Sequence, residues 1–218
     1  MVMYHRAVSI AGNEGAVLGV DLIRIDWHKK HDAFNLIVLP FVSGTNILYL
    51  TSGKDSMLWI QFYLFALYLL FDTLWVTVRP QSVSSPATII FHHLICLIGW
   101  IVPHYSDPSL SMWTSLGLAV EINTFFLIAR RYFGRTLPLQ VAFYSTWIIL
   151  RLLLYPVVLY FFVFKYIEYS MKENQGNFLN TGLFVLSTMI FLNMLNLKWS
   201  CDLFLKSQSL VKKDHRGL

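Results

Sequence analysis

Apolar residues along the chain are gathered in six long windows separated by short polar stretches. The windows cover residues 33–50, 57–78, 87–102, 110–129, 139–164 and 178–197. Together they hold 122 residues and only three charged side chains, Asp72, Glu121 and Arg151. An α-helix rises about 1.5 Å per residue, so roughly 20 apolar residues cross the hydrocarbon core of a bilayer. The pattern therefore predicts an all-α integral membrane protein, a bundle of about six transmembrane helices.

The windows divide the chain into three parts. Residues 1–32 form a polar N-terminal segment, residues 33–206 the transmembrane domain and residues 207–218 a basic tail. The first window is the weakest, because Asn35 and the run from Ser43 to Asn46 interrupt it. A first helix buried in the bundle tolerates such polar residues, and a re-entrant segment is the alternative.

Composition excludes several classes of protein. Of the 218 residues, 56% are hydrophobic and 13% are charged, whereas about 25% of the residues of a soluble domain are charged. The two cysteines, Cys96 and Cys201, do not make a disulfide framework. The net charge of +5 resides in loops and tails, so it bears on membrane orientation, and we expect no nucleic-acid partner.

Lysine and arginine are distributed unequally between the two predicted faces of the membrane. The two ends of the chain and the loops 79–86 and 130–138 carry 13 of them, against three on the opposite face, Lys54, Lys165 and Lys172. Cytosolic loops of membrane proteins carry an excess of Lys and Arg. We therefore expect both termini to be cytosolic.

Polar side chains inside the windows are candidates for function, because ionisable groups are costly in hydrocarbon. Counted along each helix from the predicted cytosolic face, their depths are about 6 Å for Asn193, about 9 Å for Asp72, His92 and His93, about 12 Å for Glu121 and about 18 Å for Arg151. The two acids have two interpretations. They take part in catalysis, or one of them forms a buried ion pair with Arg151 that fixes the helix register.

The adjacent histidines cannot both point into one pocket, because neighbouring residues on a helix are about 100° apart. One of His92 and His93 can act as a general base while the other packs or hydrogen-bonds. Cys96 lies four residues after His92 on the same face, so a Cys–His nucleophile is conceivable, although packing is the commoner role of such a cysteine. His104 falls at the opposite membrane face, and the sequence predicts no metal site.

An ordered set of motifs resembles a known family. It begins with an aspartate in an aromatic-rich helix (YLLFDTLWV) and a histidine pair at the start of the next helix (FHHL). An acid followed by Thr-x-Phe and arginine comes third (VEINTFFLIARRYFG), then an arginine five residues before proline (RLLLYP) and the stretch LNMLNLKW. This order is similar to that of the TLC-domain family over roughly residues 33–206. The resemblance implies a bundle of at least six helices that encloses a lipid-sized tunnel.

The TLC-domain family includes ceramide synthases, which join a fatty acyl group from acyl-CoA to a sphingoid amine. It also includes TLC-domain-containing proteins that are associated with membrane lipid composition or trafficking. The ceramide-synthase branch carries a His-Asp and a second aspartate in the helix after the histidine pair, where this chain has Glu121-Ile122-Asn123-Thr124. The chain is therefore more similar to the second branch. We expect an endoplasmic reticulum or other endomembrane location, with the plasma membrane as the alternative.

Two hypotheses of function follow from the resemblance. The first is an acyl-CoA-dependent acyltransferase of lipid metabolism that acts on a lipid amine or a lysolipid. In this hypothesis the catalytic residues are His92, His93, Asp72 and Glu121. The polar core is formed by Arg151, Asn193 and Thr124. The acyl-CoA headgroup is bound by Arg79, Arg130, Arg131 and Arg135. Acyl-CoA is then a co-substrate, and no resident cofactor is expected. The second is a non-catalytic lipid-binding, lipid-composition-regulating or trafficking protein whose partners are membrane lipids.

Overall fold

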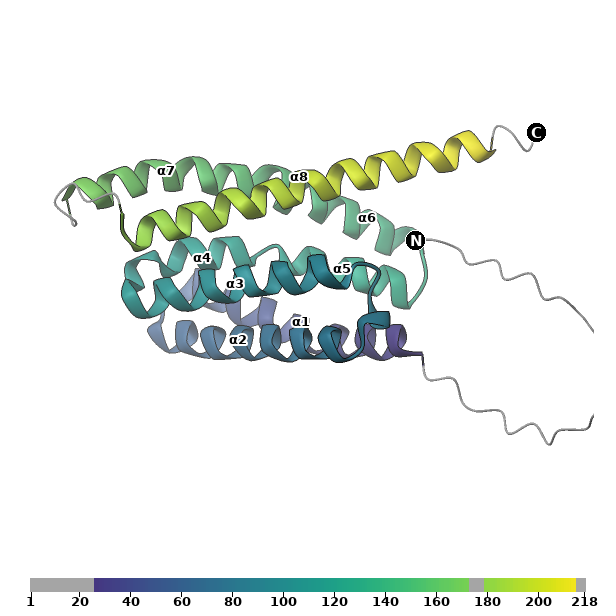
Figure 1. Cartoon of the computed structure of the whole chain (residues 1–218), viewed down its shortest axis with the longest axis horizontal. Coiled ribbons are helices and arrows are strands. Elements are labelled where there is room, and N and C mark those ends of the chain that lie inside the picture. The colour runs from purple at the N-terminus through teal and green to yellow at the C-terminus, as the bar shows by residue number, and fades with distance from the viewer. Residues whose placement is uncertain (1–25, 173–178, 215–218) are drawn as a thin grey trace, which may run out of the picture.

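The computed structural model describes residues 26–172 and 179–214, with side chains described as far as residue 205. In chain order the helices are α1 Trp27–Ser52, α2 Asp55–Val78, α3 Pro86–Ser106, α4 Ser111–Leu118, α5 Glu121–Tyr132, α6 Leu137–Thr146, α7 Tyr155–Lys172 and α8 Thr181–Asp214. They pack side by side as one bundle (Figure 1). Six helical segments of the described chain are long and apolar enough to cross a membrane. The predicted all-α membrane fold is confirmed.

Helix α1 is longer than the apolar window that predicted it. The Asp26 side chain accepts the backbone N–H of Lys29 at 3.2 Å and caps a helix that begins at Trp27. At the other end Gly53 adopts a left-handed φ of 63°, which favours glycine, and its N–H bonds the Tyr49 carbonyl. The helix is continuous over 26 residues. This contradicts the re-entrant alternative.

The fourth and fifth windows each contain more than one helical segment. A turn at residues 119–120 separates α4 from α5, and residues Pro108–Tyr132 cross the bundle as one span. The fifth span consists of α6, the π-helical segment η3 (Trp147–Leu154) and α7 in unbroken succession. Pro156 follows η3 closely and lacks the N–H that would continue the helical hydrogen-bond ladder. A wider turn is a common accommodation of proline in a membrane helix.

Buried polar side chains hold α1 against its neighbours. The Gln61 amide on α2 donates to Asn46 Oδ1 on α1 at 2.5 Å and to the Ser115 hydroxyl on α4 at 3.3 Å. Asp32 on α1 forms an ion pair with Arg131 on α5, with Arg131 Nε 2.6 Å from Asp32 Oδ2. Interhelical hydrogen bonds of this kind stabilise membrane bundles, because hydrocarbon offers no alternative partner. They fix the position of α1 along the bundle axis.

The outward-facing side chains are apolar over much of the bundle. More than half of the surface of Ile37 and Phe41 on α1, Leu74 on α2 and Phe161 on α7 is exposed. Monomeric soluble proteins rarely expose contiguous apolar patches of this kind. Lipid acyl chains are the environment that such a surface fits.

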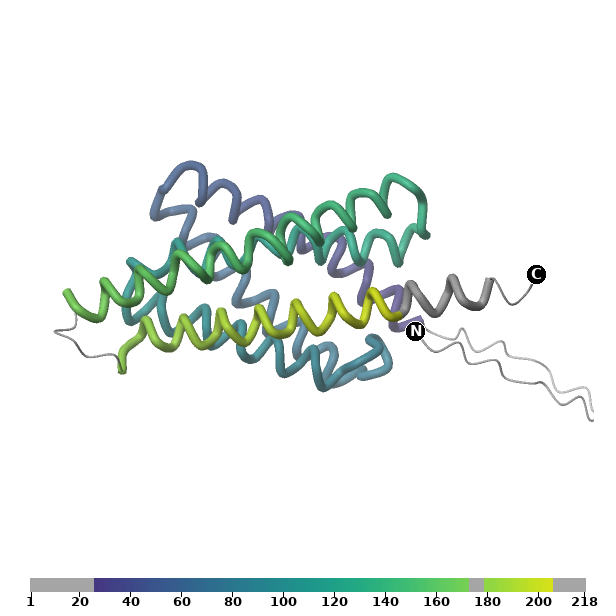
Figure 2. Tube along the Cα trace, turned by 90° about the horizontal axis from the view of Figure 1, so that it is seen from above, coloured from purple at the N-terminus to yellow at the C-terminus, as the bar shows by residue number. Residues whose placement is uncertain are grey.

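The start of α1 and the end of α8 lie at the same end of the bundle (Figures 1 and 2). An even number of crossings produces this arrangement. Which face of the membrane that end occupies stays a prediction. Of the predicted polar N-terminal segment, residues 1–25 lie outside the described residues. Helix α8 continues to Asp214, so most of the predicted tail 207–218 is helical, and residues 215–218 lie outside the described residues.

Candidate functional site

Asp72 is the centre of a buried network that joins three helices. Its Oδ1 accepts from His31 Nε2 on α1 at 2.6 Å and from the Asn35 amide at 3.2 Å. Its Oδ2 lies 3.5 Å from His93 Nδ1 on α3. The Tyr68 hydroxyl donates to Asn35 Oδ1 at 2.8 Å and closes the network. Asp72 is 2% exposed, so its contacts are with protein groups.

His92 and His93 face different surroundings, as their separation on the helix predicts. His93 faces α2, where the Thr73 hydroxyl also lies 3.4 Å from its Nδ1. His92 lies edge-on to Trp199 of α8, with ring centroids 5.4 Å apart, and it lines a pocket. Of the two histidines, His92 is therefore the one that can meet a ligand.

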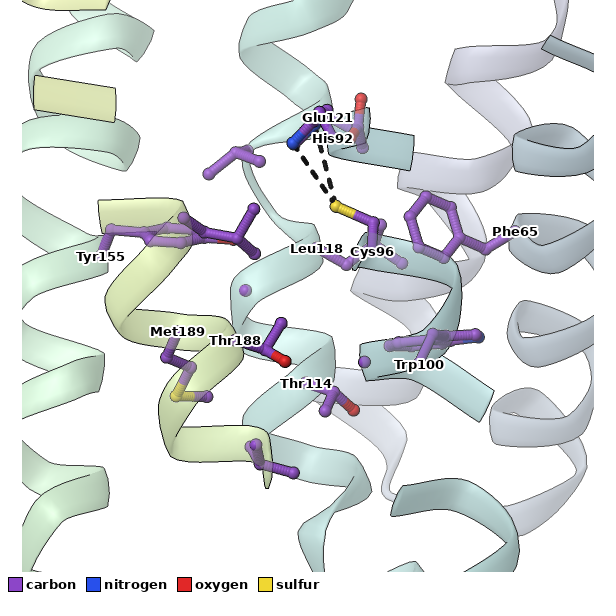
Figure 3. Close-up of a pocket in the computed structure, with 15 residues that line it drawn as sticks. Phe65, His92, Cys96, Trp100, Thr114, Leu118, Glu121, Tyr155, Thr188 and Met189 are labelled. Carbon is purple, nitrogen blue, oxygen red and sulfur yellow. Dashed lines mark hydrogen bonds between the residues drawn. The ribbon is translucent and has the colours of Figure 1, made fainter. Parts of the chain in front are cut away.

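The pocket lies between α3, the junction of α4 and α5, α7 and α8 (Figure 3). The empty space between its walls is about 540 Å³ with its open mouth included. His92, Cys96 and Glu121 lie together in one part of it (Figure 3). The apolar walls are formed by Phe65, Trp100, Leu118, Val185, Met189 and Leu192. The pocket therefore combines a small region of chemically reactive side chains, His92, Cys96 and Glu121 (the reactive region), with apolar walls.

Three chemically different groups meet in the reactive region. The Cys96 Sγ lies 3.7 Å from Nδ1 and 3.8 Å from Nε2 of His92. Glu121 is 8% exposed. Glu121 is the first residue of α5, because the chain turns at residues 119–120. The N-terminal end of a helix is a favourable place for a carboxylate.

The predicted ion pair between Arg151 and either Asp72 or Glu121 is wrong. The guanidinium donates to three neutral oxygen atoms: Nε to Asn123 Oδ1 at 2.8 Å, one Nη to Asn196 Oδ1 at 2.7 Å and the other to Thr124 Oγ1 at 3.1 Å. Within residues 26–172 and 179–205, Arg151 has no carboxylate oxygen within ion-pair distance. Asp72 is already engaged by His31, Asn35 and His93.

Aromatic rings complete the surroundings of Arg151. Its Cζ lies 5.2 Å from the ring centroid of Trp147 and 5.6 Å from that of Trp199. A guanidinium is attracted to the face of an indole, most strongly where water is absent. Trp199 also contacts His92. The polar core around Arg151 and the reactive part of the pocket therefore share one side chain.

The sequence model of the TLC-domain family matches residues 34–205, more than three quarters of the chain. The chain belongs to the TLC-domain family. It is thus a multi-pass membrane protein of this family, and the resemblance noted from the motifs is confirmed. Comparison with curated proteins and with solved structures gave no match.

The four arginines predicted to bind a headgroup are engaged differently in this TLC domain. Arg131 pairs with Asp32, and the Cζ of Arg130 lies 3.9 Å from the centroid of the Phe143 ring. Arg79 is exposed, and its Cζ lies 4.5 Å from the ring centroid of Trp27 on α1. Arg135 is exposed in the loop between α5 and α6. Arg79, Arg131 and Arg135 are all exposed, but Arg131 is engaged by the Asp32 carboxylate, and Arg130 is partly buried against Phe143.

Sequence reasoning missed residues that complete both polar networks of this TLC-domain protein. His31 lies outside the first apolar window, because that window begins where the charged residues end. The helix-capping residue Asp26 is the sequence signal that α1 begins before His31. Asn193 was predicted in the polar core, yet its amide donates to the Met189 carbonyl of its own helix. Asn196, nearly one turn further along α8, reaches Arg151 instead.

The side chains in the pocket are of types that can carry out proton transfer and nucleophilic attack. An imidazole can take and return a proton, a thiol can form a covalent intermediate, and a carboxylate can orient or accept a proton. Within the part of the chain that the structure describes, no group of three or more His, Cys, Asp or Glu side chains is arranged to hold a metal ion.

Proposed function

We propose that this TLC-domain protein is an acyl-CoA-dependent acyltransferase of membrane lipid metabolism. The observation that carries the proposal is the position of His92 in an otherwise largely apolar pocket. A fatty acyl chain requires an apolar space, and its thioester carbonyl requires a base close to the attacking group. The pocket offers both within one cavity.

In the proposed reaction His92 takes the proton from the amine or hydroxyl of the acceptor lipid as that group attacks the thioester carbonyl. Glu121, in the same part of the pocket, holds the acceptor by a hydrogen bond. Asp72 and His93 do not line the pocket. They act as positioning residues, because their contact ties α3, which carries His92, to α2 and through His31 to α1.

The orientation of acyl-CoA follows from the distribution of charge. His92 lies six residues after the start of α3, about 9 Å below the end of the bundle where α2 and α5 also end. The exposed Arg79 and Arg135 are at that end and suit the phosphates of coenzyme A. The acyl chain then extends away from His92 along the apolar walls. The proposal includes a cytosolic opening and an endomembrane location, with the plasma membrane as the alternative.

The test uses the purified full chain in lipid nanodiscs with labelled acyl-CoA and a panel of long-chain amines and lysolipids. We expect wild type to acylate at least one acceptor and His92→Ala to lose about 10²-fold or more of that rate. His28→Ala is the matched control, because His28 is exposed on α1. Turnover that is equal in wild type and in His92→Ala would overturn the assignment of the base.

A non-catalytic lipid-binding protein is the second candidate. The mostly apolar walls of the pocket favour it, because they bind an acyl chain whether or not chemistry follows. Its signature is saturable binding of a labelled lipid that Leu118→Trp abolishes, together with no acylated product for any acceptor. Untargeted lipidomics of cells that lack the protein, rescued by wild type or by His92→Ala, tests the same distinction in the cell.

A further inference from the structure

We infer that Cys96 is the residue that carries the acyl group between donor and acceptor, as a thioester on its sulfur. The inference deepens the proposed function and rests on it, since it names the residue that accepts the acyl group. It is carried by two observations, the proximity of Cys96 to His92 and the apolar pocket that both side chains line.

The geometry places a nucleophile and a base together. Cys96 lies four residues after His92, one turn further along α3, and Figure 3 shows its sulfur directed toward the imidazole. The sulfur is 3.7 Å and 3.8 Å from the two ring nitrogens, so either tautomer of His92 has a nitrogen within reach of the thiol proton. A thiol beside an imidazole is the arrangement in which histidine activates cysteine as a nucleophile.

The hydroxyl groups in the pocket, on Thr114, Tyr155 and Thr188, are placed less favourably for this role, and that of Thr114 donates to the Ser111 carbonyl at 2.9 Å. The Thr188 hydroxyl donates to the Phe184 carbonyl of its own helix at 3.0 Å. The Tyr155 hydroxyl lies against the backbone at Gly117, where an added Cβ would be 3.3 Å from the phenol oxygen. Within the described residues, Cys96 is the pocket side chain that has an imidazole as its neighbour and a nucleophilic atom facing it.

The chemistry is a pair of acyl transfers without oxidation or reduction. The Cys96 sulfur attacks the thioester carbon of acyl-CoA as its proton passes to His92. The bond from that carbon to the coenzyme A sulfur breaks, and coenzyme A leaves as a thiol with the proton from His92. The acceptor amine or hydroxyl then attacks the Cys96 thioester and gives its proton to His92, and the Cys96 sulfur leaves and recovers that proton.

An apolar pocket suits this intermediate. The first step exchanges one thioester for another, so no bond of a different class has to be made. A thioester enclosed by Leu118, Met189 and Leu192 is shielded from hydrolysis, because these side chains exclude water from the carbonyl. The acyl chain keeps the position along the walls that it had in acyl-CoA.

The test is intact-protein mass spectrometry of the full chain in detergent with palmitoyl-CoA and no acceptor. We expect the mass to increase by one palmitoyl group, and neutral hydroxylamine to remove it. Cys96→Ala should show no adduct, whereas Cys201→Ala, which removes the exposed cysteine of α8, should keep it. His92→Ala should slow adduct formation about 10²-fold or more. Adduct that persists in Cys96→Ala, on His92 or elsewhere, would overturn the inference.

The two proposals fail in different ways. Adduct on Cys96 without acylation of any acceptor overturns the transferase and, with it, the role of Cys96 as a carrier between donor and acceptor. Acceptor turnover at the wild-type rate in Cys96→Ala supports the transferase and overturns this inference. If Cys96→Ala does not elute as a monodisperse protein, Cys96→Ser replaces it. A second measurement uses the wild-type protein and N-ethylmaleimide. Palmitoyl-CoA should protect Cys96 from this reagent while Cys201 still reacts. Equal labelling of Cys96 with and without palmitoyl-CoA would contradict the inference.

Discussion

Arg151 shows how a single charge is accommodated in the interior of this bundle. A guanidinium has five N–H groups, and here three of them are directed at oxygens of neutral side chains. An amide dipole solvates a cation less strongly than a carboxylate does, but it brings no second charge into the low-dielectric interior. The stability of the site therefore depends on each of the neutral acceptors.

Replacing Arg151 with Met should destabilise the protein, because Asn196 Oδ1 and Asn123 Oδ1 lose their donor. An unsatisfied buried polar group costs about 1–3 kcal/mol. The double variant Arg151→Met, Asn196→Leu should recover part of the loss. The measurement is thermal unfolding in detergent, and Asn193→Leu is the control, because the Asn193 amide donates to the Met189 carbonyl of its own helix. Strictly additive losses in the double variant would contradict the contact.

Alanine variants of the two adjacent histidines should differ in their effects on thermal stability and on acyl transfer. His93→Ala removes a partner of the buried Asp72 and should lower thermal stability. His92→Ala should leave the unfolding temperature close to that of wild type and reduce acyl transfer about 10²-fold or more. Parallel unfolding and turnover measurements on both variants check this. A His93→Ala protein as stable as wild type would show that the contact with Asp72 contributes nothing.

At the scale of helices, most of the architecture follows from the sequence. Each span needs about 20 apolar residues, and the apolar windows locate all six spans, although window 33–50 left a re-entrant segment as an alternative. The start of α1 could not be placed in the same way, because charged residues near an interface belong to the helix without adding to its apolarity. The depth of a residue along its helix can also be predicted from the sequence, because the rise per residue is constant. The direction in which a side chain points is set by packing, so depth alone does not predict that Asp72 meets His31 whereas Arg151 meets Asn123 and Asn196.

Helices α3 and α8 are close together at Gly99, where both line the pocket. A Cβ at Gly99 would lie 2.6 Å from Cγ2 of Thr188, which is a clash. Small residues allow membrane helices to approach closely. Gly99→Ala should therefore lower thermal stability, and Thr188→Ala in the same chain should restore most of it, because that change removes the clashing methyl group. Unfolding temperatures of the two single variants and the double variant decide the point; an unchanged Gly99→Ala protein would count against the close approach.

At the scale of the whole molecule, the even number of spans and the distribution of basic residues together predict the topology. Arg135, between α5 and α6, should be cytosolic, and Lys54, between α1 and α2, should lie on the opposite side. The test introduces Cys at each position in a chain without Cys201 and labels intact cells or sealed vesicles with an impermeant maleimide. Labelling from the cytosolic side of the Lys54→Cys protein, and not of the Arg135→Cys protein, would show that the orientation is the reverse of the predicted one.

Helix α8 is too long for the membrane that it crosses. Its 34 residues measure about 51 Å, against a hydrocarbon core of about 30 Å, and its C-terminal end projects beyond the other helices (Figure 1). The same rod carries Thr188 and Met189 in the wall of the pocket and Asn196 at the guanidinium of Arg151. About 30 Å of its length fits inside the hydrocarbon core and about 21 Å projects beyond it. The projecting end of α8 and one wall of the pocket therefore belong to the same continuous helix.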